Sequence, residues 1–236
     1  MSNFHNLTVC PFYLRELEET ASPLVKDYAA KSDRMLIAFG GIKGFRAIPP
    51  YEFWNITREI EVKKIFVRDF SQAWYQAGLP GIASDVDSMA KFLKAEVRSQ
   101  NVRHLTLLGN SMGGYAALLF GNLLEADTSI AIAPQTFLNQ VERLRHLDFR
   151  WFRQMCQAQK YNHNPQHLNL KELLRTPRTH QDLQVHYNGF FDSAHAHHLR
   201  DCANVRLIHH PDGGHDLVRH LRKNGQLKQI ILNAIQ

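Results

Sequence analysis

The sequence predicts an α/β fold, in which a mostly parallel β-sheet is flanked by helices. Two observations carry this prediction. Short apolar runs recur along the chain, and glycine, proline or polar residues follow each of them. Segments with apolar residues at helical spacing lie between these runs. Strands buried on both faces read as continuous apolar runs, and parallel neighbours need a crossover connection, so this alternation favours a parallel sheet.

Each apolar run is predicted as a strand because apolar residues dominate it and turn residues bound it. In chain order the predicted strands are residues 35–39, 64–67, 104–108, 129–133, 183–187 and 205–208. Residues 7–9 are a further candidate for a strand near the amino terminus.

Helices are predicted at residues 84–98, at 112–124, at 195–200 and from 216 to the carboxyl terminus. Ser84 and Asp87 form a candidate capping box for the first helix, and Asn224-Gly225 predicts a break in the last. The stretch from Gln135 to His180 is longer than a simple crossover and is rich in arginine, glutamine, histidine and aromatic residues. We expect it to form helices above the strand ends, as a lid or rim, and a peripheral structural insertion is the alternative.

Composition limits the classes of function. The chain has 236 residues and 44% of them are hydrophobic, which suits a single domain with a full core. The amino-terminal residues show no basic region followed by an apolar run, and no apolar stretch approaches the ~20 residues of a membrane span. We therefore expect neither a signal peptide nor a membrane span. Cys10, Cys156 and Cys202 are too sparse for a disulfide framework, which indicates reduced thiols and a cytoplasmic location.

The net charge of +6 would suit an anionic partner, but the basic residues are scattered and no nucleic-acid-binding motif accompanies them. No nucleic-acid partner is therefore expected. The sequence contains no P-loop and no G-x-G-x-x-G pattern, so no nucleotide cofactor is expected either. His195 and His198 would share a helix face, but no acidic or cysteine ligand accompanies them at ligand spacing, and no metal site is predicted.

The most specific motif is Gly109-x-Ser111-x-Gly113, which lies between an apolar strand and a helix rich in alanine and leucine. This context is typical of a nucleophile elbow, a strained strand-to-helix turn that exposes one serine. Glycine at the flanking positions leaves room for the neighbouring strand and helix. The free N–H groups at the start of the helix favour the negative charge that an attacked carbonyl oxygen develops. Ser111 is therefore the predicted nucleophile.

A serine nucleophile needs a base, and the base needs an acid that orients it. His215 is the candidate base, because it follows the last predicted strand and two glycines allow a tight loop before it. His209 and His210 compete with it. Asp192 is the candidate acid, because it lies in the loop after the preceding strand, although it would also serve as an N-cap for the short helix. The rival carboxylates are Asp182, Asp201 and Asp212.

An oxyanion hole needs two N–H donors. The N–H of Met112, the residue after the nucleophile, is one candidate, and the other would come from the loop after an earlier strand. Phe39-Gly40-Gly41-Ile42 is that loop, and its glycines allow the backbone to approach a substrate closely. Gly41 and Ile42 both remain candidates for the second donor.

Together these motifs resemble those of the α/β-hydrolase family, over the chain from about Met35 to the carboxyl terminus. The motifs that carry the resemblance are Gly109-Asn110-Ser111-Met112-Gly113, Asp192, Gly214-His215 and Phe39-Gly40-Gly41. The resemblance implies a doubly wound sheet, with Ser111 as nucleophile, His215 as base and Asp192 as acid. The chain departs from the family in its short length, in the lack of a clear first pair of strands, and in Phe39, where many members have histidine.

The sequence thus predicts a serine hydrolase that cleaves a small-molecule carboxylic ester or thioester through an acyl-enzyme. A carbohydrate-directed deacylase, a peptidase and a non-catalytic binding protein are the alternatives, because a fold does not select a substrate. Trp74 and Tyr75 follow a strand end, and Arg150 and Arg153 lie in the long insertion, so these four are the candidate substrate-binding residues. A packed loop that covers the core is the alternative for the two aromatic residues.

Overall fold

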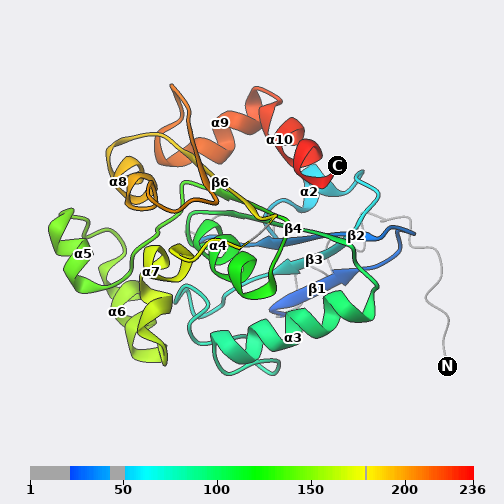
Figure 1. The fold of residues 1–236 in the computed structure, drawn as a ribbon, viewed down its shortest axis with the longest axis horizontal. Helices are drawn as coiled ribbons and strands as arrows, with labels where there is room; N and C mark the ends of the chain where they lie inside the picture. The colour runs from blue at the N-terminus through cyan, green and yellow to red at the C-terminus, as the bar shows by residue number, and fades with distance from the viewer. Residues whose placement is uncertain (1–21, 43–50, 179) are drawn as a thin grey trace.

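The computed structural model describes residues 22–42, 51–178 and 180–236, which contain a seven-stranded sheet (Figure 1). The strands lie in the order β1-β3-β2-β4-β5-β6-β7. All neighbouring strands are parallel except β1 and β3, which are antiparallel. The strands are β1 (Leu24–Asp27), β2 (Arg34–Phe39), β3 (Lys63–Val67), β4 (His104–Asn110), β5 (Thr128–Ile132), β6 (Asp182–Tyr187) and β7 (Val205–His209).

Helices occupy most of the connections between strands and the carboxyl-terminal part of the chain. The α-helices are α2 (Trp54–Thr57), α3 (Val86–Ser99), α4 (Met112–Leu124), α5 (Gln140–Arg145), α6 (Phe152–Tyr161), α7 (Leu170–Leu174), α8 (Phe190–His198), α9 (Leu217–Lys223) and α10 (Gln226–Ile235). Two short 3-10 helices are η1 (Pro165–Leu168) and η2 (Gly214–Asp216). None of the helices in the described ranges is long and apolar enough to cross a membrane.

The sheet is covered on both faces, because successive side chains of a strand point to opposite sides. Ile37 and Leu107 belong to the core that contains side chains of α3 and α4. Their neighbours Leu36 and Leu108 belong to the core that contains side chains of α9 and α10. Figure 1 shows these two pairs of helices on opposite sides of the sheet. The predicted mostly parallel, doubly wound sheet is confirmed.

The six predicted strands are present, and their ends differ from the predicted ends by at most two residues. The structure adds β1, an edge strand of sequence Leu-Val-Lys-Asp, which is too short and too polar to form an apolar run. The capping box of α3 is formed by Asp85 and Ser88, so the predicted box of Ser84 and Asp87 is wrong by one residue. The candidate strand at residues 7–9 lies outside the described residues.

The predicted insertion between β5 and β6 contains α5, α6, η1 and α7. These α-helices and α8 gather at one end of the molecule, at the left in Figure 1. The prediction placed the start of α8 at residue 195, but the helix begins at Phe190, directly after Gly189 with φ +84°. Asp192 therefore lies in the first turn of α8 and is not its N-cap.

Candidate active site

Ser111 lies in the turn between β4 and α4. Its backbone has φ +54° and ψ −118°, a conformation that L-residues rarely adopt. The N–H of Ser111 donates to the carbonyl oxygen of Ile132, at the end of the neighbouring strand β5, at 2.8 Å. A Cβ atom on Gly109 would lie 1.9 Å from the carbonyl oxygen of Gly113, and one on Gly113 would lie 2.2 Å from that of Phe39. Space therefore requires glycine on both sides of the serine.

The three predicted triad residues lie in hydrogen-bond contact. Ser111 Oγ lies 3.2 Å from His215 Nε2, and His215 Nδ1 lies 2.9 Å from Asp192 Oδ2 and 3.0 Å from Asp192 Oδ1. The Asp192 side chain is 2% exposed and the His215 side chain 35% exposed. An ionised carboxylate only accepts hydrogen bonds, so Asp192 places the proton of neutral His215 on Nδ1. Nε2 is then free to accept the proton of Ser111 when the serine attacks an electrophile.

Glycines in two loops allow the acid and the base to reach the serine. Gly189 is the N-cap of α8 after β6, which places Asp192 in the first turn of the helix. Gly213 and Gly214 follow β7 with φ +115° and +55°, values that favour glycine. The N–H of Gly214 donates to Asn188 Oδ1 at 2.8 Å, which ties the loop after β7 to the loop after β6.

The rival histidines and carboxylates have other surroundings. Of the rival bases, His209 packs against Tyr187 and His210 bonds to His186. Of the rival acids, Asp182 pairs with Arg206, Asp201 pairs with Lys171, and Asp212 is exposed. Within the described ranges, none of the five forms a hydrogen bond or an ion pair with the triad residues.

The N–H groups predicted for an oxyanion hole differ in their bonding. Met112 is the first residue of α4, so its N–H has no carbonyl partner within the helix. The N–H of Gly41 donates to Glu52 Oε2 at 2.8 Å, and the side-chain amide of Asn110 donates to Glu52 Oε1 at 3.1 Å. Glu52 thereby joins the loop after β2 to the elbow. In the part of the chain that the structure describes, no acceptor binds the N–H of Ile42, which favours Ile42 over Gly41 as the second donor.

Arg150, a candidate for substrate binding, contacts the triad acid. Its Nη1 donates to Asp192 Oδ1 at 3.0 Å, and its Nε and Nη2 contact both carboxylate oxygens of Asp148 at 2.7 to 3.1 Å. The guanidinium carbon lies 5.0 Å from the ring centroid of Trp151 and 4.7 Å from that of Phe191. Two carboxylates already match its charge, which favours a role beside the triad over the binding of an anion. Arg153, the other candidate arginine, is exposed on α6.

Trp74 and Tyr75 are completely buried in the loop after β3. The hydroxyl of Tyr75 donates to the carbonyl oxygen of Gly40 at 2.8 Å, so it fixes the loop that holds the oxyanion candidates. The indole N–H of Trp74 has no acceptor among the described residues. This burial fits the alternative of a packed loop better than it fits a substrate pocket.

An exposed apolar surface, here called the apolar rim, adjoins the triad. Its seven side chains are between 36% and 81% exposed: Val141, Leu144, Leu147, Phe149, Phe152, Phe190 and Phe191. The rim reaches the catalytic candidates at two points, because Phe191 precedes Asp192 and because Trp151, next to Phe152, packs on the His215 ring at 5.1 Å between centroids. Exposed apolar side chains gathered beside a candidate active site favour the binding of a ligand or a partner there.

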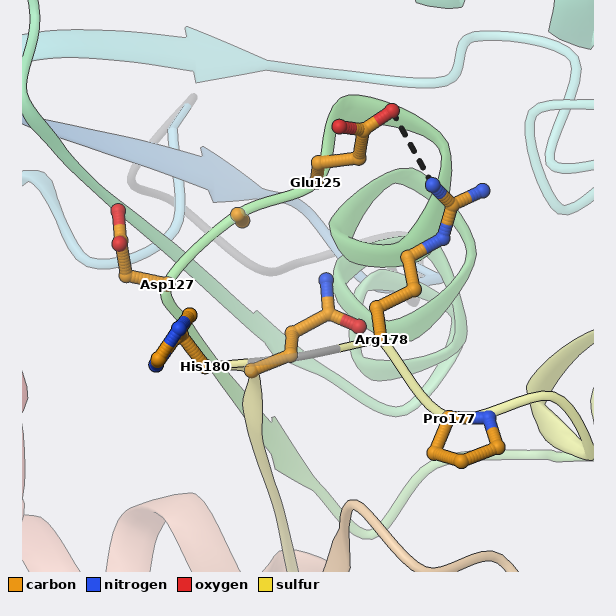
Figure 2. Close-up of a pocket in the computed structure, with 7 residues that line it drawn as sticks. Glu125, Asp127, Pro177, Arg178 and His180 are labelled. Carbon is orange, nitrogen blue, oxygen red and sulfur yellow. Dashed lines mark ion pairs between the residues drawn. The ribbon is translucent and has the colours of Figure 1, made fainter.

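Two shallow pockets lie outside the triad. One, of about 410 Å³, lies beside the apolar rim and is lined by Leu147 and Phe190 among others. Figure 2 shows the other, of about 320 Å³, where Arg178 pairs with Glu125 at 3.1 Å. This second pocket lies at the amino ends of β5 and β6, whereas Ser111 follows the carboxyl end of the parallel strand β4. It is therefore on the opposite edge of the sheet from the candidate active site.

One group of side chains has the composition of a metal site. Glu142, His146 and His198 each place a ligand atom within 4.8 Å of the others. Burial lowers the pKa of His198 to about 4, so its imidazole is neutral at pH 7, as a ligand must be. His195, which the sequence pairs with His198, bonds instead to Asp148 Oδ2 at 3.1 Å. The expectation that the protein binds no metal stays a prediction.

No protein-family model matches the chain, and no curated protein sequence matches it. Solved structures do match. A capsule O-acetyltransferase of Neisseria meningitidis serogroup A has a TM-score of 0.63 and 13% identity, over 92% of this chain and 99% of that chain. A lipase-esterase related protein from Clostridium acetobutylicum has a TM-score of 0.57 and 14% identity, over 92% and 100%. Acetyl xylan esterase 1 from Thermoanaerobacterium has a TM-score of 0.54 and 13% identity, over 94% and 91%. The chain has the α/β-hydrolase fold.

Proposed function

We propose that the protein is a serine hydrolase that cleaves a carboxylic ester or a thioester through an acyl-enzyme. The observation that carries the proposal is the hydrogen-bonded chain from Ser111 through His215 to Asp192, with distances of 3.2 and 2.9 Å. The strained elbow that carries Ser111 supports it further. Proteins with this fold include esterases and a fluorophosphonate-binding serine hydrolase, which supports an enzymatic role for this one.

In the proposed reaction, Ser111 Oγ attacks the carbonyl carbon while its proton moves to His215 Nε2. The N–H groups of Met112 and Ile42 stabilise the negative charge on the carbonyl oxygen. The bond from carbon to the leaving alcohol or thiol then breaks, and His215 gives its proton to the leaving group. Water attacks the acyl-enzyme, His215 takes its proton and returns it to Ser111 Oγ, and the carboxylic acid leaves.

A fluorophosphonate probe tests the nucleophile, because only an activated serine attacks its phosphorus readily. We expect the wild-type protein to be labelled once, at Ser111, as read by mass spectrometry of its peptides. Ser111→Ala should abolish the labelling, and Ser99→Ala, on the surface of α3, is the control that should keep it. Labelling that survives Ser111→Ala unchanged would contradict the proposal, and so would a folded wild-type protein that is not labelled.

A substrate panel then tests the reaction class. One series of esters with a common alcohol and one series of thioesters with a common thiol, each varied in acyl length, would show which acyl groups the enzyme accepts. In one outcome, the probe labels the protein but the protein hydrolyses neither esters nor thioesters. Ser111 would then be reactive, but the proposed deacylation by water would not occur. That result would contradict the hydrolase proposal and favour transfer to another acceptor.

Acyl chemistry on a carbohydrate is a second candidate. The observation that favours it is the presence of a capsule O-acetyltransferase and an acetyl xylan esterase among the proteins of similar fold. The same acyl-enzyme would serve both candidates, because they differ in the acceptor or the acyl donor. The test offers an activated acetyl ester with and without an oligosaccharide. An O-acetylated sugar in the mass spectrum favours transfer, whereas free acetate alone favours hydrolysis.

A further inference from the structure

We propose that Asp148 and Arg150 form a positioning pair for the triad acid, Asp192. The inference rests on the proposed function, because it assigns a role to Asp192 in that reaction. Arg150 Nη1 donates to Asp192 Oδ1 at 3.0 Å, while His215 Nδ1 lies 2.9 Å from Asp192 Oδ2. His215 Nδ1 also lies 3.0 Å from Asp192 Oδ1, so the base contacts both oxygens while Arg150 binds one of them. The two donors together fix the orientation of the carboxylate toward the base.

The Arg150 guanidinium is itself held rigidly. Its Nε and Nη2 bind both oxygens of Asp148, the two-point geometry that matches guanidinium to carboxylate. The rings of Trp151 and Phe191 lie against it at 5.0 and 4.7 Å. An arginine fixed by a fork and by two aromatic rings has little freedom, so its remaining Nη1 points at Asp192 before any substrate binds.

The hydrogen bonds continue from Asp148 to the backbone of the loop after β5. The N–H of Thr136 donates to His195 Nδ1 at 3.0 Å. A backbone N–H can only donate, so His195 carries its proton on Nε2, and Nε2 donates to Asp148 Oδ2 at 3.1 Å. Burial lowers the pKa of His195, in agreement with a neutral ring. The direction of each bond is thus fixed from Thr136 to Asp148.

The charges of the pair support each other. The Asp148 side chain is 2% exposed and the Arg150 side chain 22% exposed. Burial alone would raise the pKa of Asp148, but the hydrogen bonds from His195 and Arg150 hold it well below its usual range. Burial alone would lower the pKa of Arg150, but its bonds to Asp148 and Asp192 raise it. Both groups therefore stay ionised at any pH at which the enzyme would work.

The pair also sets the electrostatic environment of the base. Among the described residues, His215 pairs with Asp192 on α8, Asp192 pairs with Arg150, and Arg150 pairs with Asp148, which also contacts His195. Asp216, the residue after His215, pairs with Arg219 on α9 at 3.6 Å. The positive charge of Arg150 disfavours protonated His215, and the negative charge of Asp148 offsets part of this effect. Loss of Arg150 should therefore stabilise the protonated base, and loss of the Asp148 charge should destabilise it.

The test measures the second-order rate constant for fluorophosphonate labelling of Ser111 from about pH 5 to about pH 9. The rate constant falls at low pH because the base is protonated there, and this part of the profile is the acid limb. The constant value that it reaches at higher pH is the plateau. Arg150→Met should move this limb up by about one pH unit and lower the plateau about tenfold. Asp148→Asn keeps an acceptor oxygen but loses the charge, and it should move the limb down by roughly half a unit. Arg145→Met is the matched control, because Arg145 is an exposed arginine of α5 paired with Glu142, and it should change neither value.

Opposite shifts for the two variants separate positioning from a structural role, since a general loss of stability would not move the limb in opposite directions. The inference would be overturned if Arg150→Met had the same acid limb and the same plateau as the wild-type protein. It would also be overturned if Asp148→Asn moved the acid limb to higher pH. Should Arg150→Met fail to fold by circular dichroism, Asp148→Asn and Arg150→Lys decide. Lysine keeps the charge without the fork, so the limb should stay and the plateau should fall. Failure of the proposed nucleophile is distinct, because the wild-type protein would then not be labelled, and failure of the hydrolase reaction would show in the substrate panel and not in the labelling.

Discussion

The elbow around Ser111 and the segment from Gln140 to Arg153 contribute to the same site by different means. The elbow is almost fully buried, and close backbone contacts of Gly109 and Gly113 fix it. The segment exposes a row of apolar side chains, yet it buries Asp148 and bonds Arg150 to a residue 42 positions away in the chain. Close backbone packing therefore fixes the elbow, which has no room for an added atom. Ion pairs fix the inner side of the segment, and its outer surface is free to vary.

The largest effect is expected where the two regions meet, at Asp192. Asp192→Asn removes the charge that stabilises protonated His215 and favours the wrong tautomer of the ring, so turnover should fall by up to about 10⁴-fold. The measurement is kcat on an ester substrate, with the melting temperature as a check on folding. Asp201→Asn is the control, since Asp201 is exposed and pairs with Lys171. Full activity in Asp192→Asn together with loss of activity in Asp201→Asn or Asp182→Asn would assign the acid elsewhere.

A second prediction tests whether close approach fixes the elbow. Gly113→Ala would place a Cβ atom 2.2 Å from the carbonyl oxygen of Phe39, which the backbone can relieve only by moving β2 or α4. The free energy of unfolding should fall by about 3 kcal/mol in urea titrations. Gly40→Ala is the matched control in the adjoining loop, because its Cβ would lie 3.5 Å from the carbonyl oxygen of Val67, an ordinary contact. Equal losses in both variants would show that close approach is not the cause.

The same contrast explains how much the sequence predicts. Buried parallel strands require continuous apolar runs, and the elbow requires glycines on both sides of Ser111. Patterns of neighbouring residues therefore predict both features. His215 is readable from its place after the last strand and from the two glycines before it. The sequence does not predict the edge strand β1, because a strand that pairs on one side alone does not need an apolar run.

Long-range polar contacts leave no such local pattern. Nothing in the sequence near Asp148 indicates that its oxygens bind His195, 47 positions later. Glu52 lies eleven residues after Gly41, and no periodicity connects the two. For Trp74, the sequence predicts the loop but does not decide between substrate and core, because both surroundings favour a large apolar ring. The sequence therefore predicts the chemical groups of the candidate site better than the residues that hold them.

Glu52 gives a third prediction, of intermediate size. Glu52→Gln keeps one acceptor oxygen but presents an NH₂ group to either Gly41 or Asn110, so one of the two contacts is lost. Loss of an oxyanion donor costs on the order of 10² to 10³ in kcat, and a loosened donor should cost about tenfold. The expected result is a lower kcat, an unchanged KM and weaker inhibition by a trifluoromethyl ketone, whose oxyanion occupies the same place.

Glu59→Gln is the control for this variant, because Glu59 is an exposed carboxylate that pairs with Lys228 at 3.3 Å. It should leave all three quantities unchanged. Inhibition of Glu52→Gln at the wild-type level would show that the carboxylate does not hold the oxyanion loop, and the second donor would have to be sought elsewhere.

The smallest effect is expected on the outer surface of the segment and of α8, and it tests whether that surface is free to vary. Phe190 is 81% exposed, so Phe190→Ser should change the free energy of unfolding by no more than about 0.5 kcal/mol. If the apolar rim binds an acyl chain, kcat/KM for a long-chain ester should fall about threefold while that for an acetyl ester stays the same, because only the long chain reaches the rim. Trp74→Ala provides the contrast: its cavity should destabilise the protein by about 3 kcal/mol or more and lower both values in the same proportion. Equal losses for both esters in Phe190→Ser would remove the rim from substrate binding, and the exposed aromatic rings would then need another partner.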